Sequence, residues 1–203
     1  MAVLSWGKPT IYVKCLSDSG AVWRKFPTPA EDSTTLETTD GEKTEAKFEG
    51  GENEDVKYGR NTYELKSDVR VAKGKNVPYA DEDGVISGIH AVIVQPEEAD
   101  CPALYIERSS MHASASYSAA DGSKRTYSWS ALKAKYGTQI KFGKVTVTEN
   151  SSTGAISNIQ FKQESVEGTD GSVKEFTEVS LYNVTDAGAS PVYVDPTQEV
   201  AAP

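Results

Sequence analysis

Between Thr62 and Ala72, apolar and charged side chains alternate one by one along the chain. A period of two places apolar side chains on one face of a β-strand and charged side chains on the other. The segment therefore predicts a strand with one buried and one wet face, as in an antiparallel sheet. The apolar positions are Tyr63, Leu65, Val69 and Val71.

Further strand signals follow along the chain. Met111 to Tyr117 alternates in the same way and leads into Ala119-Ala120-Asp121-Gly122, after which Tyr127 and Trp129 lie two residues apart. This pattern predicts a β-hairpin. We also expect strands at Thr10–Cys15, Ala21–Phe26, Ile86–Val94, Ala103–Glu107, Gln139–Thr148, Ala155–Lys162 and Phe176–Asn183.

Signals for a bulge, a short helix and several turns complete the secondary-structure prediction. Apolar positions change parity around Gly143, which predicts a bulge or bend. Ser130 is a candidate N-cap for a short helix over 131–136 that Gly137 would end. Gly supplies the positive φ of tight turns, so we expect turns of an antiparallel sheet at Asp40-Gly41, Asp83-Gly84, Asp121-Gly122 and Asp170-Gly171.

The chain of 203 residues is long enough for one sizeable β-domain. We expect an all-β fold over 1–194, an antiparallel curved β-sandwich or barrel with one short helix and a long acidic loop. Residues 144–194 either complete this domain or form a C-terminal extension. Residues 195–203 lack any sustained pattern and are expected to be a flexible tail.

The segment from Thr38 to Arg60 is rich in acidic residues and poor in apolar ones. Long loops without a regular pattern often have a function, so we interpret it as a loop or extended arm that contacts another subunit. A solvated acidic hairpin is the alternative, because charged runs are usually wet faces. The predicted contact residues are Glu42, Glu45, Phe48, Glu49, Gly50, Gly51, Glu52, Glu54 and Asp55.

Charge and hydropathy restrict the partners. The net charge of −9 argues against tight nucleic-acid binding, because such binding depends on Lys and Arg replacing the counterions of phosphates. The first residues have no basic start and no apolar run of signal-peptide length. No stretch has the length of apolar sequence that a membrane-spanning helix needs. We therefore expect a soluble protein that is made in a cytoplasm, with no membrane partner.

No catalytic constellation is visible. The only imidazole bases are His90 and His112, and the alternation around each places it on the more polar face of a strand. We interpret both as ordinary strand histidines, because neither belongs to a recognisable motif. P-loop, dinucleotide-binding and nucleophile-elbow motifs are absent from the sequence. The sequence thus predicts no enzyme and no catalytic residue.

Metal and cofactor sites are not predicted either. Two acidic clusters occur, at 97–100 and at 81–83, and a specific Ca²⁺ site is expected at neither. The cluster at 81–83 lacks the ligand spacing of an EF-hand, and its Asp83-Gly84 is explained as a turn. Cys15 and Cys101 are isolated, so we expect buried or half-buried thiols, with a single disulfide between them left open. Trp6, Trp23 and Trp129 are expected to be core residues rather than sugar platforms.

In the order and texture of several segments, the chain resembles the major tail tube protein of long-tailed bacteriophages, a family similar in fold to the tube protein of bacterial type VI secretion. The resemblance covers roughly residues 1–145. It depends on Leu4–Pro9, Phe26–Thr34, Gly41–Ala46, Glu49–Gly51, Asn61–Leu65 and Tyr117–Gly122.

The resemblance implies a structural virion protein that is made in the bacterial cytoplasm and belongs to the virion tail. Its subunits would form rings, as in hexameric members of the family, and the rings would stack into a hollow tube alongside other phage tail proteins. An extended loop, here around Gly50-Gly51, would reach the neighbouring ring. DNA would pass through an acidic lumen without specific binding, because like charges repel.

Two other classes remain open from the sequence. A carbohydrate-binding or adhesin-like β-sandwich has the same pattern of strands and turns, and it is favoured by the presence of Tyr and Trp residues, which can stack on sugars. A hydrolase is the third class, although no nucleophile and base pair supports it.

Overall fold

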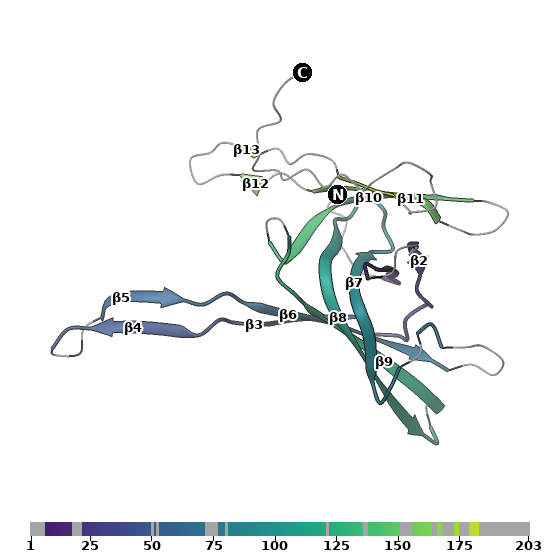
Figure 1. Ribbon diagram of the computed structural model, residues 1–203, viewed down its shortest axis with the longest axis horizontal. Coiled ribbons are helices and arrows are strands. Elements are labelled where there is room, and N and C mark those ends of the chain that lie inside the picture. The colour runs from purple at the N-terminus through teal and green to yellow at the C-terminus, as the bar shows by residue number, and fades with distance from the viewer. Residues whose placement is uncertain are drawn as a thin grey trace.

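The computed structural model of the protein describes residues 7–17, 22–49, 51, 53–71, 77–79, 81–120, 122–135, 138–150, 156–163, 166–167, 173–174 and 179–182. Antiparallel strands make up its regular structure, and the described residues contain no helix (Figure 1). The strands are β1 (Thr10–Cys15), β2 (Arg24–Lys25), β3 (Thr35–Thr39), β4 (Lys43–Lys47), β5 (Asn53–Tyr58), β6 (Thr62–Arg70), β7 (Val85–Gln95), β8 (Ala103–Ser118), β9 (Gly122–Ala131), β10 (Ile140–Glu149), β11 (Ile156–Gln163), β12 (Val166–Glu167), β13 (Val173–Lys174) and β14 (Val179–Tyr182).

Strand β8 organises the main sheet. β7 pairs with one edge of β8, and the other edge is shared between two strands. β10 pairs with residues 103–106 of β8, whereas β9 pairs with residues 109–118. The sheet therefore forks at β8 into a β10-β11-β14 wing and a β9-β6-β3 wing, while β7, β1 and β2 follow on the opposite side. It is an open, curved sheet, and the barrel alternative of the sequence prediction is wrong.

The fork creates two apolar clusters, one on each face of β7 and β8. The main cluster lies against the β9-β6 wing and includes Leu65, Val92, Ile106 and Trp129. The second lies against β10 and β11 and includes Ile93, Tyr105 and Phe161. Burial on both faces explains the uninterrupted apolar run Ala91–Val94, because side chains of both parities leave water there.

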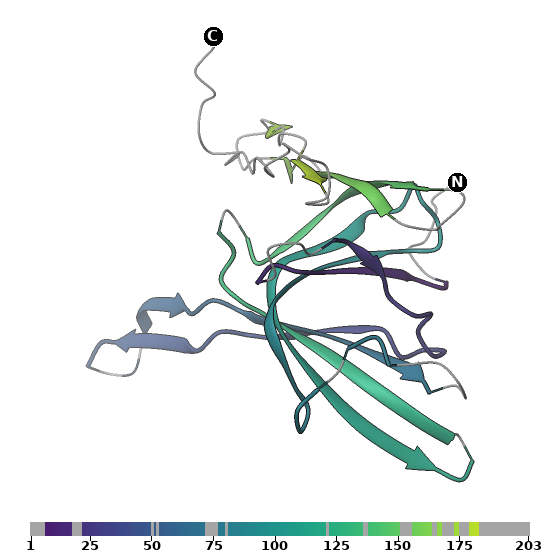
Figure 2. The ribbon, with the colours of Figure 1, turned by 45° about the vertical axis from the view of Figure 1, so that its right-hand side comes forward.

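The predicted hairpin at Asp121-Gly122 is confirmed in its pairing. β8 and β9 form a long ribbon that ends at the Ser118 and Gly122 pair, and Figure 2 shows this ribbon extending beyond the rest of the sheet. At the other predicted turn, Asp83 and Gly84 both have positive φ, of 51° and 90°. Glu82 and Val85 exchange two backbone hydrogen bonds of 3.0 Å around them, as in a type I′ turn.

The predicted helix over 131–136 is wrong for its described part. β9 continues through Ala131, which pairs with Ser109 of β8, and residues 132–135 form no helix. Ser130 pairs with Ser110 on one side and with Glu64 on the other. Pairing on both edges outweighs the local preference for a helix start, since strand preference depends strongly on neighbouring strands.

The structure also differs from the prediction at two glycines, Gly143 and Gly41. The register of β10 runs unbroken through Gly143, so there is no bulge at this residue. Gly143 instead marks the change of partner from β8 to β11, which explains why the apolar positions switch from one cluster to the other. Asp40-Gly41 does not reverse the chain but joins β3 to β4 along one extended path (Figure 1). Asp170-Gly171 and the tail 195–203 lie outside the described residues.

Candidate functional site

The most distinctive feature is a two-stranded ribbon, here named the arm, formed by residues 35–66. β3 and β6 form its base, and β4 and β5 form its distal half. Figures 1 and 2 both show it projecting from the body of the molecule. The acidic segment is thus an extended β-hairpin, which was one of the alternatives left open by the sequence, and not a structureless loop.

A joint separates the two halves of the arm. Gly59 N donates a hydrogen bond of 2.8 Å to the carbonyl oxygen of Glu42, and Gly41 N donates one of 3.0 Å to Asn61 Oδ1. A Cβ atom on Gly41 would lie 2.3 Å from the carbonyl carbon of Gly59. Real Cβ atoms do not approach backbone so closely, so the two chain segments can lie this close together only with glycine at this position.

The distal half of the arm has no core of its own. Every residue of β4 is exposed or half-buried, and its pairing with β5 is the only extensive contact that β4 makes within the described chain. Phe48 and Tyr58 are 55% and 68% exposed. Two-stranded hairpins without such support are only marginally stable in water.

Ion pairs between charged side chains lie on the surface of the arm. Glu45 forms ion pairs with Lys43 and Lys47 on its own strand, and the hydrogen bond from Lys43 lowers the pKa of Glu45. At the base, Lys66 bonds Glu37 at 2.8 Å and Glu64 at 3.0 Å, and the bond to Glu37 contributes most to raising the pKa of Lys66. These pairs are largely exposed, so they organise side chains rather than stabilise the fold.

The arm brings most of the predicted contact residues together. Glu42 lies in the joint, Glu45 lies in β4, and Phe48 and Glu49 follow β4 toward the tip. Gly51 has a φ of 93° in the tip turn, where its N–H bonds the carbonyl oxygen of Phe48 at 3.0 Å. Two further predicted residues, Glu54 and Asp55, lie in β5, whereas Gly50 and Glu52 lie outside the described residues.

Sequence reasoning missed a groove at the base of the arm. The groove has a volume of about 530 Å³ and lies between the start of β6 and the segment that joins β9 to β10. Among the described residues, its lining contains three basic residues and no acidic one. The lining residues are Arg60, Asn61, Tyr63, Lys133, Ala134, Lys135, Thr138 and Gln139.

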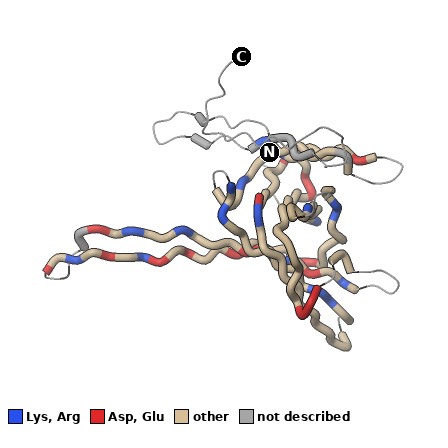
Figure 3. Tube along the Cα trace, in the orientation of Figure 1, with Lys and Arg blue, Asp and Glu red and all other residues tan. Residues whose placement is uncertain are grey.

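No sequence signal for this groove exists, because Arg60 and Lys133 are far apart in the chain and come together only through the pairing of β6 with β9. In Figure 3, Lys and Arg gather on the body just above the base of the arm, while acidic residues mark the far end of the arm. The groove and the arm tip thus have opposite charge.

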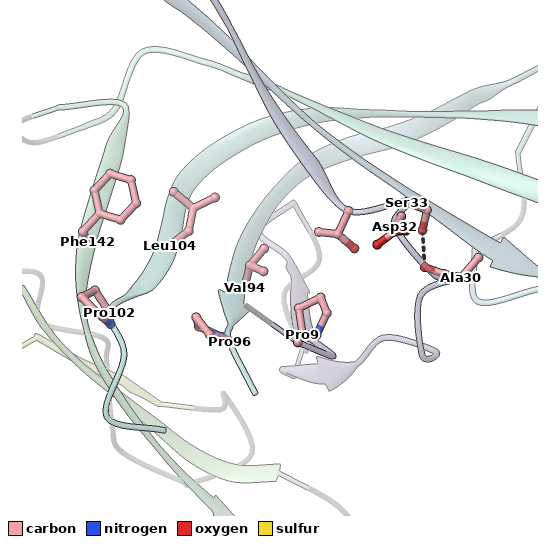
Figure 4. A pocket seen from close by; sticks show the side chains of 11 residues that line it. Pro9, Ala30, Asp32, Ser33, Val94, Pro96, Pro102, Leu104 and Phe142 are labelled. Carbon is pink, nitrogen blue, oxygen red and sulfur yellow. Dashed lines mark hydrogen bonds between the residues drawn. The ribbon is translucent and has the colours of Figure 1, made fainter. Parts of the chain in front are cut away.

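A second cavity, of about 390 Å³, opens where the two sides of the curved sheet do not meet. Figure 4 shows Phe142 and Leu104 on one side of it and Ala30, Asp32 and Ser33 on the other. Ser33 Oγ donates a hydrogen bond of 2.8 Å to the carbonyl oxygen of Ala30. Its described lining mixes apolar side chains with Asp32, Ser33 and Thr34, and Asp32 has no second titratable group beside it in this lining for proton transfer.

The two histidines lie in different environments. His112 is exposed, in agreement with the predicted polar face, but His90 is only 1% exposed and the prediction for it is wrong. The His90 ring meets Tyr79 edge to face, with ring centroids 5.5 Å apart. The register of β7 shifts on both sides of His90, next to Gly88, so alternation cannot be followed through this stretch.

One buried ion pair connects β8 to β10. Lys141 Nζ lies 2.7 Å from Glu107 Oε2, and Lys135 N donates a hydrogen bond of 3.1 Å to Glu107 Oε1. Burial lowers the pKa of Lys141, and its bond to Glu107 acts in the opposite direction. With its partners so engaged, the carboxylate holds the fork of the sheet together rather than facing a substrate cavity.

The other sequence candidates have structural roles in the described chain. Asp81 accepts a hydrogen bond from Gly84 N and pairs with Arg125, whose hydrogen bond lowers the pKa of Asp81. Cys15 and Cys101 are free thiols, half-buried and buried as predicted. No group of three or more His, Cys, Asp or Glu side chains that could hold a metal occurs in this part of the chain.

Helices long and apolar enough to cross a membrane are absent from the described residues. No protein-family model matches the sequence, and no curated protein is significantly similar to it.

Proposed function

We propose that this chain is a structural virion protein that assembles with copies of itself into stacked rings, forming the tube of a phage tail. The observation that supports this proposal most is the distal half of the arm, an extended hairpin with exposed strands and no core of its own. Ordering a chain segment costs about 1–2 kcal/mol per residue in backbone entropy. Contacts with a neighbouring subunit would offset this cost.

Free strand edges support the same proposal. β4 pairs with β5 alone and β3 pairs with β6 alone, so each leaves an edge of backbone N–H and C=O groups without a strand partner in the described chain. Such edges invite pairing with another chain, and charged side chains discourage unselective pairing. The Lys and Glu residues of β4 fit an edge that is reserved for one specific partner.

The acidic balance supports the proposed role as a conduit. With a net charge of −9, a ring of such subunits would repel phosphates and let a duplex slide without adhering. We infer a virion-tail location after synthesis in the bacterial cytoplasm, with other tail proteins as partners. DNA would be cargo that passes without specific binding, and a hexamer is the ring size that the family resemblance suggests.

The alternative function, a carbohydrate-binding or adhesin-like module, has less support. Sugar platforms need exposed aromatic rings, and Tyr58 and Tyr117 are 68% and 80% exposed. Trp23 and Trp129 are only 3% and 0% exposed, however, and both belong to the apolar clusters of the sheet. Trp6 lies outside the described residues.

Electron microscopy of the full chain tests the proposal. We expect negative-stain images of concentrated protein to show rings or tubes, and sedimentation velocity to show association that increases with concentration. A strictly monomeric protein at millimolar concentration would contradict the proposal. A glycan array then decides for or against the sugar-binding alternative.

A further inference from the structure

We propose that the basic groove at the base of the arm receives the acidic tip of the arm of a second copy of this chain. The inference rests on the proposed self-assembly and identifies the surface that the arm contacts. The groove is the one lined by Arg60, Lys133 and Lys135, and the tip comprises residues 48–55.

Charge complementarity is the first argument. The tip sequence, Phe-Glu-Gly-Gly-Glu-Asn-Glu-Asp, contains four acidic residues and no basic one. Glu49 and Asp55 are exposed in the structure. The groove lining has the opposite composition, and its Arg60 and Lys133 side chains are exposed as well. Complementary patches of this kind guide association and fix which surfaces meet.

Apolar contact is the second argument. Phe48, next to Glu49, is 55% exposed and has no aromatic partner in the described part of its own chain. Within the groove, Tyr63 is half-buried and Ala134 is buried, so the floor between the cations is less polar than the rim. An aromatic anchor surrounded by charged pairs is the usual arrangement of a specific protein interface.

Geometry gives the contact a direction. The groove adjoins the joint at Arg60, opposite Gly41, and the tip lies about 25–30 Å farther along the arm at about 3.3 Å per extended residue. Tip and groove are different surfaces, so a head-to-tail contact is heterologous and leaves each bound copy with its own free tip for the next. Heterologous contacts generate closed rings or open filaments. Neighbouring grooves should then be about 25–30 Å apart.

Exchanging charges between the two surfaces tests the inference in the full chain. We would reverse the groove with Arg60→Glu and Lys133→Glu, and reverse the tip with Glu49→Lys and Asp55→Lys. Each double variant alone should need about tenfold more protein to assemble, because repulsion replaces attraction at two sites. An equimolar mixture of the two should co-assemble, since a reversed tip complements a reversed groove.

The matched control reverses Lys8 and Lys25, which are exposed and lie outside the groove. The control variant should assemble like wild type, and calorimetry should show all variants folded. Zero-length carbodiimide cross-linking of mixed unlabelled and ¹⁵N-labelled wild type should join Glu49 to Lys133 between copies.

The possible failures are distinguishable. If wild type does not associate, the proposed self-assembly is wrong and the inference is wrong with it. If wild type associates while the groove variant does so equally well, or if the mixed variants stay apart, only the assignment of the groove is overturned. A groove variant that unfolds leaves the cross-link as the deciding measurement, and its absence in associated wild type refutes the contact.

Discussion

Removing the distal half of the arm should leave the stability of the body nearly unchanged while abolishing assembly. Thr44 and Lys57 are directly paired, so a clean truncation deletes residues 45–54 and replaces Asp55-Val56 with Asn-Gly. Thr44 and Lys57 are then joined by a two-residue loop of the type I′ sequence that antiparallel ribbons prefer. The joint at Gly41 and the base of the arm stay intact.

The expected change in the free energy of unfolding follows from burial. None of the deleted residues whose burial is described is buried, and the ion pairs of Glu45 join this half-buried carboxylate to two exposed lysines. Surface ion pairs contribute about 0–1 kcal/mol, and the shorter connection recovers roughly 1 kcal/mol or less of closure entropy. The net effect should be within about 1 kcal/mol, or a shift in Tm of about 2–4 °C at most.

Differential scanning calorimetry measures the stability of the variant, at a concentration where wild type is monomeric. Sedimentation velocity on the same preparation measures association. A loss of more than about 3 kcal/mol would show that the arm belongs to the core of its own subunit. Unaltered association with intact stability would show that the arm is only a solvated hairpin.

Three further predictions concern residues outside the distal half of the arm. Leu65→Asp should lower the free energy of unfolding by about 4 kcal/mol or more, because Leu65 is buried. Leu36 is its more exposed neighbour on the paired strand, so Leu36→Asp should cost under about 1 kcal/mol. Urea unfolding measures both variants. Lys141→Met should cost about 3–5 kcal/mol by leaving the Glu107 carboxylate buried without its cation, and adding Glu107→Leu should recover most of the loss. Burial raises the pKa of Tyr79 to about 12, above its unfolded value near 10, so its contribution is complete below pH 10 and about 2–3 kcal/mol should be lost by pH 12. Absorbance titration of the tyrosines with parallel circular dichroism checks the last of these, and a Tyr79→Phe variant that loses stability equally with pH would contradict it.

The sequence predicted strands well wherever one face of a strand meets the core. The period of two around Leu65 depends only on which face is wet, and β6 accordingly begins at the predicted residue. The predicted helix failed at Ser130 because strands on both sides were invisible in the local pattern. Around His90, register shifts in β7 destroy the parity on which the prediction depended.

The candidate site was predicted only in part, for a related reason. Its acidic residues lie within one short segment of the chain, so composition alone indicated an exposed segment between Thr38 and Arg60. The groove depends on residues at the start of β6 and on the segment that follows β9, which come together only through the long-range pairing of β6 with β9. The fork at β8 is likewise unpredictable from local pattern, because one strand edge is divided between two partners.

The fork also sets an order of events during folding. β7, β8 and β9 are consecutive in the chain and pair as a local meander, so their loops close early and at low entropic cost. β6 reaches β9 only across residues 71–121, which contain β7 and β8, so this pairing closes later. The base of the arm therefore joins the body late, after β7, β8 and β9 have paired. Newly made chains would complete their folding as single molecules before they present the surface on which polymerisation depends.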